Sequence, residues 1–412
     1  MSEYQYNKVT PEMIEKFKEI APKRVLVGDE INEDFTHDEM AIYGKARPEV
    51  LVEATSTEEV AAVVKLCNEN KVPVTPSGAR TGLVGGAVSI GGGVMISLTK
   101  MNKILGYDKE NFVVKIQSGV LLNDLAQDAE KQGLLYPPDP GEKFATVGGN
   151  VATNAGGMRA VKYGCTRDYV RAMTVVLPTG EIVKLGATVS KTSSGYSLLN
   201  LMIGSEGTLG IITKIYLKLV ALPKYQMDLL AVFSNLDDAI ALTPKVMNAG
   251  ITPVCVEFMD NASIKQVEIF LNEKLQHSDI GNYIIIQIAG DSEDVLDEQC
   301  EKIVELAEEN NAIDSLVADP AVIWKSRKAY LEADRARSLV FSMEDIVVPM
   351  TEIPGAVQKI SRLGEKYNVA MHCAGHCGDG NVHIDILKDD RTQEEWEEML
   401  PKIQGEIYAL VY

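Results

Sequence analysis

The chain has 412 residues, 46% of them hydrophobic and 24% charged, which predicts a globular protein of two or three domains with ample core. Its formal net charge of −19 argues against nonspecific binding to nucleic acid or to an anionic membrane surface, and no apolar run is long enough to span a membrane. The six cysteines are scattered and residues 1–30 lack a signal-peptide pattern, so we expect free thiols and a cytoplasmic location.

The N-terminal segment, residues 1–45, is polar and is expected to be mainly helical. Thr10 is a candidate N-cap, and Pro11 follows at the first helical position, where a missing N–H costs nothing. We interpret this segment as an entry to the first large domain.

Residues 46–222 alternate short β-branched runs with helical patterns and glycine-rich turns, which is typical of α/β structure. A strand is expected at 49–54, a helix at 57–70 and a further extended stretch at 73–76. Glycines become less frequent beyond this region, so we place a domain boundary near Pro223.

Three glycine-rich runs interrupt this region, and each interleaves glycines with hydroxyl, amide or charged side chains. Backbone N–H groups in such loops can cradle an anion such as pyrophosphate, and close backbone approach suits a flat, polar heterocycle. The first run is neither a dinucleotide GxGxxG motif nor a P-loop. One run alone is more often a structural turn, whereas three favour an extended cofactor site. The runs are residues 76–82, 146–157 and 204–213.

Residues 223–412 are expected to form a second domain, in which longer amphipathic stretches alternate with strands. Strands are predicted at 283–289 and 346–350, and a helix at 396–411. The most informative segment of the chain, residues 372–383, also lies here.

Segment 372–383 holds three of the five histidines of the chain, set among glycines. Imidazole is the commonest metal ligand and transfers protons near neutral pH, and glycines allow a turn tight enough to aim two rings at one point. The spacing of His372, His376 and His383 therefore favours a metal or acid–base site over histidines that merely pack beside a strand at 382–387.

Neighbouring residues leave some alternatives open. Cys373 and Cys377 could complete a cysteine–histidine zinc site, although their one-residue offsets from histidines fit a small, buried segment better. Asp385 shares a strand face with the last histidine and could join it as a ligand, while an exposed carboxylate on a strand is equally ordinary. Asp379 and Asn381 are expected to shape the turn.

The three glycine-rich runs, followed by His376-x-Gly-Asp-Gly-Asn-x-His383, resemble the motif order of the D-2-hydroxyacid dehydrogenase branch of the vanillyl-alcohol oxidase/PCMH superfamily. That branch contains D-lactate dehydrogenases, the glycolate oxidase D subunit and D-2-hydroxyglutarate dehydrogenases. The resemblance covers about residues 45–390. The flanking sequence is most similar to lactate dehydrogenases of anaerobes that work with an electron-transferring flavoprotein.

The resemblance implies an α+β fold, with a PCMH-type FAD-binding domain of two α/β subdomains at 46–222 and an α+β cap domain with an antiparallel sheet at 223–412. It also implies noncovalent FAD, because covalent members attach the flavin through a His or Cys and the first run offers neither. The residues expected to hold FAD are Pro76, Ser77, Gly78, Ala79, Arg80, Thr81, Gly82, Thr146, Gly148, Gly149, Asn150, Thr153, Asn154, Gly157, Glu206, Gly210 and Ile211.

The resemblance assigns the chemistry of the second domain as well. Arg327 matches the arginine that binds the substrate carboxylate, and its alternative reading is a solvated charge on a helix. His376 and His383 match the ligands of a divalent metal (iron, zinc or manganese), which lowers the pKa of the substrate hydroxyl. The substrate hydride then passes to flavin N5.

One part of the family pattern is not found. The pattern continues into a Ser-Gly-Glu-His-Gly-type segment, which supplies a further metal ligand and a candidate base, and the present sequence ends at Tyr412 without it. His372 is then the candidate base within the chain.

These features predict oxidation of a D-2-hydroxy acid, D-lactate above all, with glycolate and D-2-hydroxyglutarate as alternatives. The sequence holds no iron–sulfur cluster motif and no nicotinamide fingerprint, so electrons are expected to pass to an external acceptor. An electron-transferring flavoprotein is the first candidate, ahead of a quinone or an iron–sulfur subunit. Two rivals are oxidation of another alcohol and a flavin-binding structural subunit of an oxidase complex, and both fit the histidines and Arg327 less well.

Overall fold

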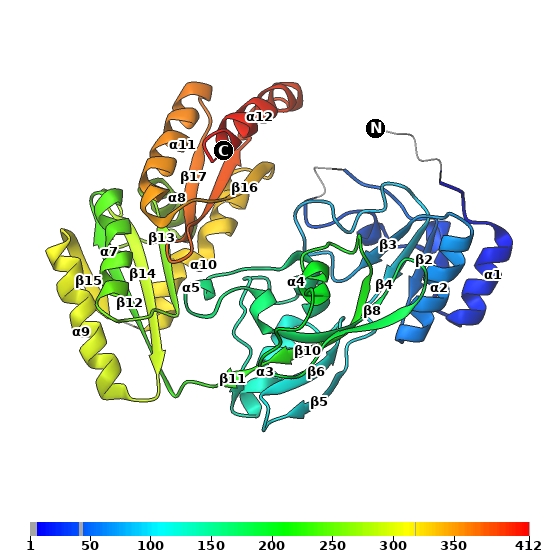
Figure 1. The fold of residues 1–412 in the computed structure, drawn as a ribbon. Helices are drawn as coiled ribbons and strands as arrows, with labels where there is room; N and C mark the ends of the chain where they lie inside the picture. The colour runs from blue at the N-terminus through cyan, green and yellow to red at the C-terminus, as the bar shows by residue number, and fades with distance from the viewer. Residues whose placement is uncertain (1–5, 41–43, 318, 412) are drawn as a thin grey trace. The chain divides into compact units, whose positions relative to one another are not determined.

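The computed structural model describes residues 6–40, 44–317 and 319–411 (Figure 1). Parts of the expected N-terminal segment, residues 1–5 and 41–43, therefore lie outside the described residues. No helix in the described part of the chain is long and apolar enough to cross a membrane.

The chain forms two compact units. The first holds the chain up to Gly157 together with Gly164–Leu222, and the second holds Met158–Tyr163 together with the chain from Pro223 onward. Each unit has its own hydrophobic core.

The first unit opens with helix α1 (Pro11–Ile20), which Thr10 caps by accepting from the Met13 N–H. Beyond α1 the entry segment is not α-helical, contrary to expectation: the three apolar residues of β1 pair with β2, and only two short 3-10 helices follow. Two parallel pairings complete a mixed sheet in the order β1-β2-β4-β3, and α2 packs on it. The bounds are β1 (Val25–Val27), β2 (Val50–Glu53), α2 (Thr57–Glu69), β3 (Val74–Ser77) and β4 (Val94–Ser97).

A second sheet of the first unit has five antiparallel strands in the order β5-β6-β10-β8-β9. Its strands are β5 (Ile104–Asp108), β6 (Val113–Gln117), β8 (Val170–Val176), β9 (Ile182–Gly186) and β10 (Ile211–Lys218). Around it lie α3 (Leu122–Lys131), α4 (Val147–Thr153), α6 (Leu198–Met202), the pair β7 (Leu134–Leu135) and β11 (Val220–Ala221), and the 3-10 helix η4 (Thr166–Tyr169). The 3-10 helices η1 (Gly28–Glu30) and η2 (Glu33–Thr36) lie beside the first sheet, where Ile31 and Phe35 pack with Leu51 and Met95.

The second unit is built on one seven-stranded antiparallel sheet in the order β15-β12-β14-β13-β17-β18-β16 (Figure 1). All six pairings in it are antiparallel, as expected for the cap domain. Its strands are β12 (Tyr225–Phe233), β13 (Cys255–Met259), β14 (Asn282–Gly290), β15 (Ala312–Val317), β16 (Phe341–Val347), β17 (Met371–His376) and β18 (Asn381–Leu387).

Helices cover both faces of this sheet. α7, α9, α11 and α12 pack on one face and bury its larger apolar cluster, while α8 and α10 pack on the other. The helices are α5 (Ala160–Tyr163), α7 (Leu236–Asn248), α8 (Asn261–Leu271), α9 (Glu293–Glu309), α10 (Pro320–Arg337), α11 (Ile353–Tyr367), α12 (Gln393–Tyr408) and the 3-10 helix η5 (Met350–Glu352).

Two expected boundaries in the second unit are wrong. The strand predicted at 346–350 is the end of β16, which stops at Val347, because Pro349 lacks an N–H and instead precedes η5. The helix predicted at 396–411 begins earlier, because Thr392 and Glu395 form a capping box ahead of its first apolar residue.

Candidate active site

The face of the sheet under α8 and α10 carries the polar residues of the second unit. Side chains alternate across a strand, and Ala374 of β17 packs into the cluster under these helices, so His372 and His376 point to the same face. The isoleucines of β18 pack on the opposite face, which turns His383 toward α8 and α10 as well. Three histidines are thereby brought to one surface of the sheet.

The hairpin between β17 and β18 depends on its glycines. Gly380 has a φ of +86°, and a Cβ there would overlap the backbone oxygen of Val348. The backbone N–H groups of Asp379 and Gly380 both donate to the His376 carbonyl, and the Asp379 carboxylate accepts from the Asn381 N–H at 3.1 Å. The expectation that Asp379 and Asn381 shape this turn is confirmed.

His376 and His383 face each other edge-on, with ring centroids 5.0 Å apart and Nε2 atoms 3.4 Å apart. A carboxylate lies behind each ring: Glu257 Oε1 is 2.6 Å from Nδ1 of His376, and Asp345 Oδ1 is 3.3 Å from Nδ1 of His383. A carboxylate at Nδ1 favours the tautomer whose Nε2 has a free lone pair. Both lone pairs then face one position between the rings.

This arrangement fits one divalent metal ion. Two nitrogens bound to zinc at about 2.0–2.1 Å and at the tetrahedral angle lie about 3.4 Å apart, and the two Nε2 atoms are 3.4 Å apart here. The carboxylates behind the rings are the usual outer partners of metal-binding histidines. Among the described residues, no third His, Cys, Asp or Glu side chain joins the pair in a ligand set.

Glu257 of β13 joins the histidine pair to α10. Its side chain is fully buried, and its second oxygen, Oε2, accepts from Nε of Arg327 at 3.0 Å. Burial acts to raise the pKa of Glu257, but the charges of His376 and Arg327 outweigh burial and hold the pKa below its usual range. Burial acts to lower the pKa of His376, and Glu257 outweighs it there, so the pKa of His376 is raised. The carboxylate is therefore ionised and shared between an arginine and a histidine.

Arg327 is held against the sheet and is not a solvated charge. Its side chain is 15% exposed, and its guanidinium lies over the Tyr330 ring at 5.7 Å from the centroid. Within the described part of the chain its Nε donates to Glu257, and its two terminal nitrogens have no hydrogen-bond partner. The terminal edge of the guanidinium can therefore bind a planar anion.

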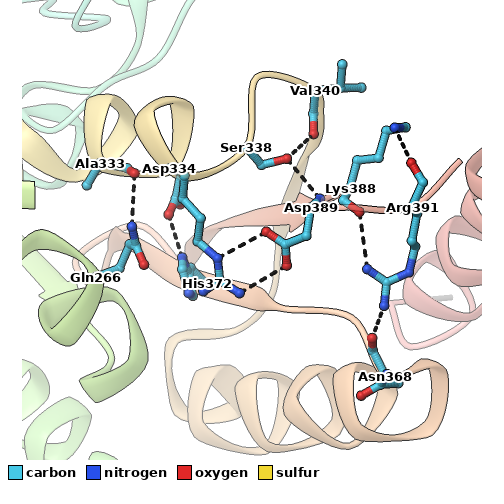
Figure 2. Close-up of polar contacts among 11 residues, drawn as sticks. Gln266, Ala333, Asp334, Ser338, Val340, Asn368, His372, Lys388, Asp389 and Arg391 are labelled. Carbon is cyan, nitrogen blue, oxygen red and sulfur yellow. Dashed lines mark hydrogen bonds and ion pairs between the residues drawn. The ribbon is translucent and has the colours of Figure 1, made fainter. Parts of the chain in front are cut away.

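His372 lies further along β17 and is held by a different helix residue. Its Nδ1 contacts Oδ1 of Asp334 on α10 (Figure 2), at a distance of 2.6 Å. The ring is buried. Asp385 is fully buried as well; burial raises the pKa of its carboxyl well above the ordinary value, and the charge of Asp334 adds to this shift. His372 thus pairs with Asp334 and not with the other two histidines, and its role as a base stays a prediction.

The cysteines of the hairpin belong to the hydrophobic core. Cys373 and Cys377 pack in the cluster on the opposite face of the sheet, and burial raises the pKa of both thiols well above the ordinary value. A zinc ligand must be a thiolate, and no ligand set that contains them occurs among the described residues. The cysteine–histidine zinc site is therefore not supported.

The three glycine-rich runs converge within the first unit. A Cβ at Gly78 would overlap the hydroxyl of Thr146, so the first run lies against the second. A Cβ at Gly207 would lie 2.6 Å from Cγ of Pro76, so the third run lies against the first. An N–H of the third run also donates to the backbone oxygen of Ala152 in the second. Segments far apart in the sequence thus form one continuous set of loops.

The second run, and Ser118 just after β6, contain buried polar groups without a hydrogen-bond partner among the described residues. Thr146 caps α4 by accepting from the Gly149 N–H at 3.3 Å, and a Cβ at Gly148 would lie 2.5 Å from Cβ of Ser118. Oγ of Ser118 and Nδ2 of Asn150 are buried and have no hydrogen-bond partner among the described residues. Buried polar groups need partners, and a hydroxyl and an amide donor are both suited to the polar atoms of a flavin. The loops therefore fit FAD.

The other residues expected to hold FAD lie on the same loops, and two of them have packing roles. Arg80 donates from Nε to the Asp34 carbonyl at 2.9 Å and lies over the Phe35 ring, so its charge is directed toward the N-terminal segment. Gly210 packs against β8, where a Cβ would lie 2.7 Å from Val175. Their contacts to FAD stay predictions, as do those of Ser77, Ala79, Thr81, Gly82, Thr153, Asn154, Gly157, Glu206 and Ile211.

Three polar residues near these sites were not predicted. Glu257 has a recognisable signal, because it is the single charged residue in the otherwise apolar strand Cys255–Met259. Such a charge is costly to bury without a partner. Ser118 and Asp345 have no comparable signal, since a serine or aspartate near the end of a strand is ordinary.

Comparison with known proteins identifies the family. Residues 48–186 match the family described as "FAD binding domain", and residues 222–411 match "FAD linked oxidases, C-terminal domain". The D-lactate dehydrogenase of Anaerostipes hadrus is 65% identical over 99% of this chain and 88% of the relative. The chain belongs to the FAD-linked D-2-hydroxyacid dehydrogenase family.

A more distant relative and a solved structure also match this chain. Glycolate oxidase subunit GlcD of Bacillus subtilis is 34% identical over 86% of this chain and 76% of the relative. A crystal structure of p-cresol methylhydroxylase with substrate bound superimposes with a TM-score of 0.80 at 17% identity, covering 97% of this chain and 87% of that one. The expected family and the α+β, PCMH-type fold are confirmed.

Proposed function

We propose that the protein is an FAD-dependent dehydrogenase that oxidises a D-2-hydroxy acid to the 2-oxo acid, with D-lactate as the preferred substrate. One observation carries the proposal: the buried carboxylate of Glu257 holds Arg327 and His376 together on one face of the second unit. A 2-hydroxy acid presents a carboxylate and a hydroxyl on adjacent carbons, and these two side chains match that pair. The relative named D-lactate dehydrogenase, at 65% identity, supports the choice of D-lactate.

Arg327 binds the substrate carboxylate. Its Nε is engaged by Glu257, so the two terminal nitrogens remain for two parallel hydrogen bonds to a carboxylate. Because the guanidinium is only 15% exposed, water screens this charge pair less than it would at the surface.

His376 and His383 would hold a divalent metal through their Nε2 atoms. A bound metal supplies Lewis-acid polarisation of the substrate hydroxyl and lowers its pKa. Glu257 and Asp345 keep the two rings in the tautomer that leaves Nε2 free. Imidazole accepts iron, zinc and manganese, and the 3.4 Å separation of the Nε2 atoms suits a tetrahedral zinc ion.

The glycine-rich loops of the first unit would hold FAD without a covalent bond, since the first run contains neither His nor Cys. Bound FAD supplies the hydride acceptor, N5 of the flavin. Ser118 and Asn150 offer a hydroxyl and an amide donor to the polar atoms of the cofactor.

Bound FAD would need an external acceptor to be reoxidised, and an electron-transferring flavoprotein is the first candidate. The six cysteines do not form the closely spaced sets of three or four that ligate an iron–sulfur cluster, which supports an acceptor on another protein. A quinone and an iron–sulfur subunit are the next candidates.

A second candidate function is oxidation of glycolate. The relative named glycolate oxidase subunit GlcD, at 34% identity, favours it, and glycolate presents the same adjacent hydroxyl and carboxylate. Oxidation of D-2-hydroxyglutarate and a purely structural role as a flavin-binding subunit are ranked below these two functions.

The test is anaerobic flavin spectroscopy of the purified protein. The oxidised-flavin band is followed while D-lactate, L-lactate, glycolate and D-2-hydroxyglutarate are added in turn. Rapid bleaching by D-lactate alone is the expected result. Bleaching by another acid would reassign the substrate, and a flavin that none of them bleaches would overturn the dehydrogenase.

A further inference from the structure

Glu257 makes two contacts of different purpose with its two carboxylate oxygens. Oε1 lies 2.6 Å from Nδ1 of His376, and Oε2 accepts from Nε of Arg327 at 3.0 Å. The side chain is fully buried, with 0% of its surface exposed to water. Glu257 therefore contacts Nδ1 of His376 and Nε of Arg327. It leaves Nε2 of the histidine and the two terminal nitrogens of the arginine free of contact with its carboxylate.

We propose that Glu257 is a positioning residue that sets the spacing between the carboxylate-binding arginine and the hydroxyl-binding metal site. This role rests on the proposed function. A 2-hydroxy acid has its carboxylate and hydroxyl on adjacent carbons, so the groups that hold them must keep a constant separation. One rigid, buried carboxylate between Arg327 and His376 provides that separation.

Only a carboxylate can satisfy both partners. Arg327 Nε–H is a donor, and His376 must donate from Nδ1 if its Nε2 is to bind a metal, so both contacts need an acceptor. Glutamine has the same shape but a single acceptor oxygen. In a Glu257→Gln protein, the amide nitrogen would face either the arginine, donor against donor, or the histidine, where it would favour the tautomer with a proton on Nε2.

Asp345 provides a matched control. It contacts the other histidine, His383, at 3.3 Å, and its side chain is 62% exposed. No hydrogen bond or ion pair joins it to Arg327 in the described part of the chain. Asp345→Asn is therefore the same carboxylate-to-amide change, applied to one half of the site.

The experiment measures two affinities on full-length, FAD-loaded protein. Zinc affinity is measured by competition with a chromophoric chelator. The carboxylate-binding half is measured separately with propionate, which has the carboxylate of lactate and no hydroxyl, by ligand-observed NMR titration of the chelator-treated protein. Wild type, Glu257→Gln, Asp345→Asn, Arg327→Ala and His383→Ala are compared.

Glu257→Gln is expected to weaken both affinities together. Loss of an outer partner typically weakens metal binding about 10–100-fold, and we expect propionate to bind roughly 10-fold more weakly because Arg327 loses a charge-assisted hydrogen bond. Asp345→Asn is expected to weaken zinc alone and to leave propionate within about twofold of wild type. Propionate binding by Glu257→Gln at the wild-type level would overturn the positioning role, as would unchanged zinc binding.

The parallel variants separate this proposal from the proposed function. If Arg327→Ala leaves propionate binding unchanged, the assignment of Arg327 to the substrate carboxylate is wrong, whatever Glu257 does. If Arg327→Ala weakens propionate and Glu257→Gln does not, only the positioning role is wrong. Should Glu257→Gln fail to retain FAD, Glu257→Asp replaces it: it keeps two acceptor oxygens on a shorter stem, and both affinities must still fall together.

Discussion

Arg327 differs from other basic residues of α10 in its burial. Lys325 pairs with Glu273 and Arg337 pairs with Asp389, and all four side chains are at least one quarter exposed. Arg327 is 15% exposed and pairs with a fully buried carboxylate. An ion pair that is shielded from water keeps its geometry, which is what a substrate-binding arginine requires.

Arg327→Ala is therefore expected to raise the KM for D-lactate about 100-fold, since a bidentate, charge-assisted pair contributes roughly 2–4 kcal/mol. FAD content should not change, because the FAD loops belong to the first unit. Steady-state kinetics with a dye acceptor measure the effect. Arg337→Ala, on the same helix, is the control and should stay within about twofold of wild type; an unchanged KM in Arg327→Ala would return this residue to a structural role.

A second ion pair, partly buried in the first unit, is expected to make that unit sensitive to acid. Arg24 and Glu59 share two hydrogen bonds, of 2.7 and 2.6 Å, and their side chains are 20% and 18% exposed. The hydrogen bond from Arg24 lowers the pKa of Glu59 below its ordinary value of 4.5. A carboxyl whose pKa falls on folding stabilises the protein above its unfolded pKa, and that stability is lost as the pH falls through the folded pKa.

Glu59→Gln is thus expected to lower the free energy of unfolding of the first unit by about 1–2 kcal/mol at pH 7. The difference from wild type should shrink as the pH falls below 4.5, because Glu59 of the unfolded chain then binds a proton that Glu59 of the folded protein binds only at a lower pH. Urea unfolding of both proteins at several pH values measures this. Glu58→Gln, at the neighbouring exposed position, should show no such difference, and a pH-independent deficit in Glu59→Gln would contradict the ionic origin.

At the scale of elements, glycine contacts hold the FAD loops together, and a hairpin holds the histidine pair His376 and His383. Gly78, Gly148 and Gly207 each let one loop touch another at a distance that a Cβ would prevent. Gly82 is different, because a Cβ there would meet nothing within 4 Å. Space beside Gly82 is therefore available to a ligand.

Gly82→Ala tests whether that space belongs to FAD. The apoprotein should unfold at the wild-type urea concentration, because the added methyl group touches no protein atom within 4 Å. FAD should bind about 10-fold more weakly, since overpacking costs roughly 1–3 kcal/mol. Fluorescence titration of the apoprotein with FAD measures the affinity. Gly405→Ala, equally open in α12, is the control, and wild-type FAD affinity in Gly82→Ala would place the cofactor elsewhere.

For the whole molecule, the two sites lie in different units: the loops that fit FAD in the first and the histidine pair in the second. Each unit buries its own apolar cluster. Loss of one ligand is therefore expected to leave the binding of the other largely intact.

Removal of the metal with dipicolinate should abolish turnover while the flavin absorbance remains with the protein. Iron(II), zinc and manganese are then added back one at a time, and the metal that restores activity is the one the site uses. His383→Ala should reproduce the chelated state, and added metal should not rescue it, because one of the two Nε2 ligands is gone. Full activity in protein shown by elemental analysis to be free of metal would remove the Lewis-acid role.

Local features of the structure were readable in the sequence because they depend on near neighbours. Thr10 and Pro11 begin α1, and the strand expected at 49–54 is β2. The glycine-rich runs and the histidine hairpin were also found in advance, since turns restrict which residues can occupy them. Predicted element boundaries were wrong where a short strand depends on a distant partner. Strand β1, for example, forms because it pairs with β2.

Motifs and their order along the chain identified the chemical candidates, which are the FAD loops, the histidine pair and Arg327. Their grouping came from tertiary structure alone. Glu257 lies 70 residues before Arg327 and 119 before His376, and only the antiparallel pairing of β13 with β17 under α10 brings the three together. Because Glu257 is buried between a sheet and a helix, its carboxylate needs partners, and it has two, Arg327 and His376. No local sequence pattern indicates which residues those partners are.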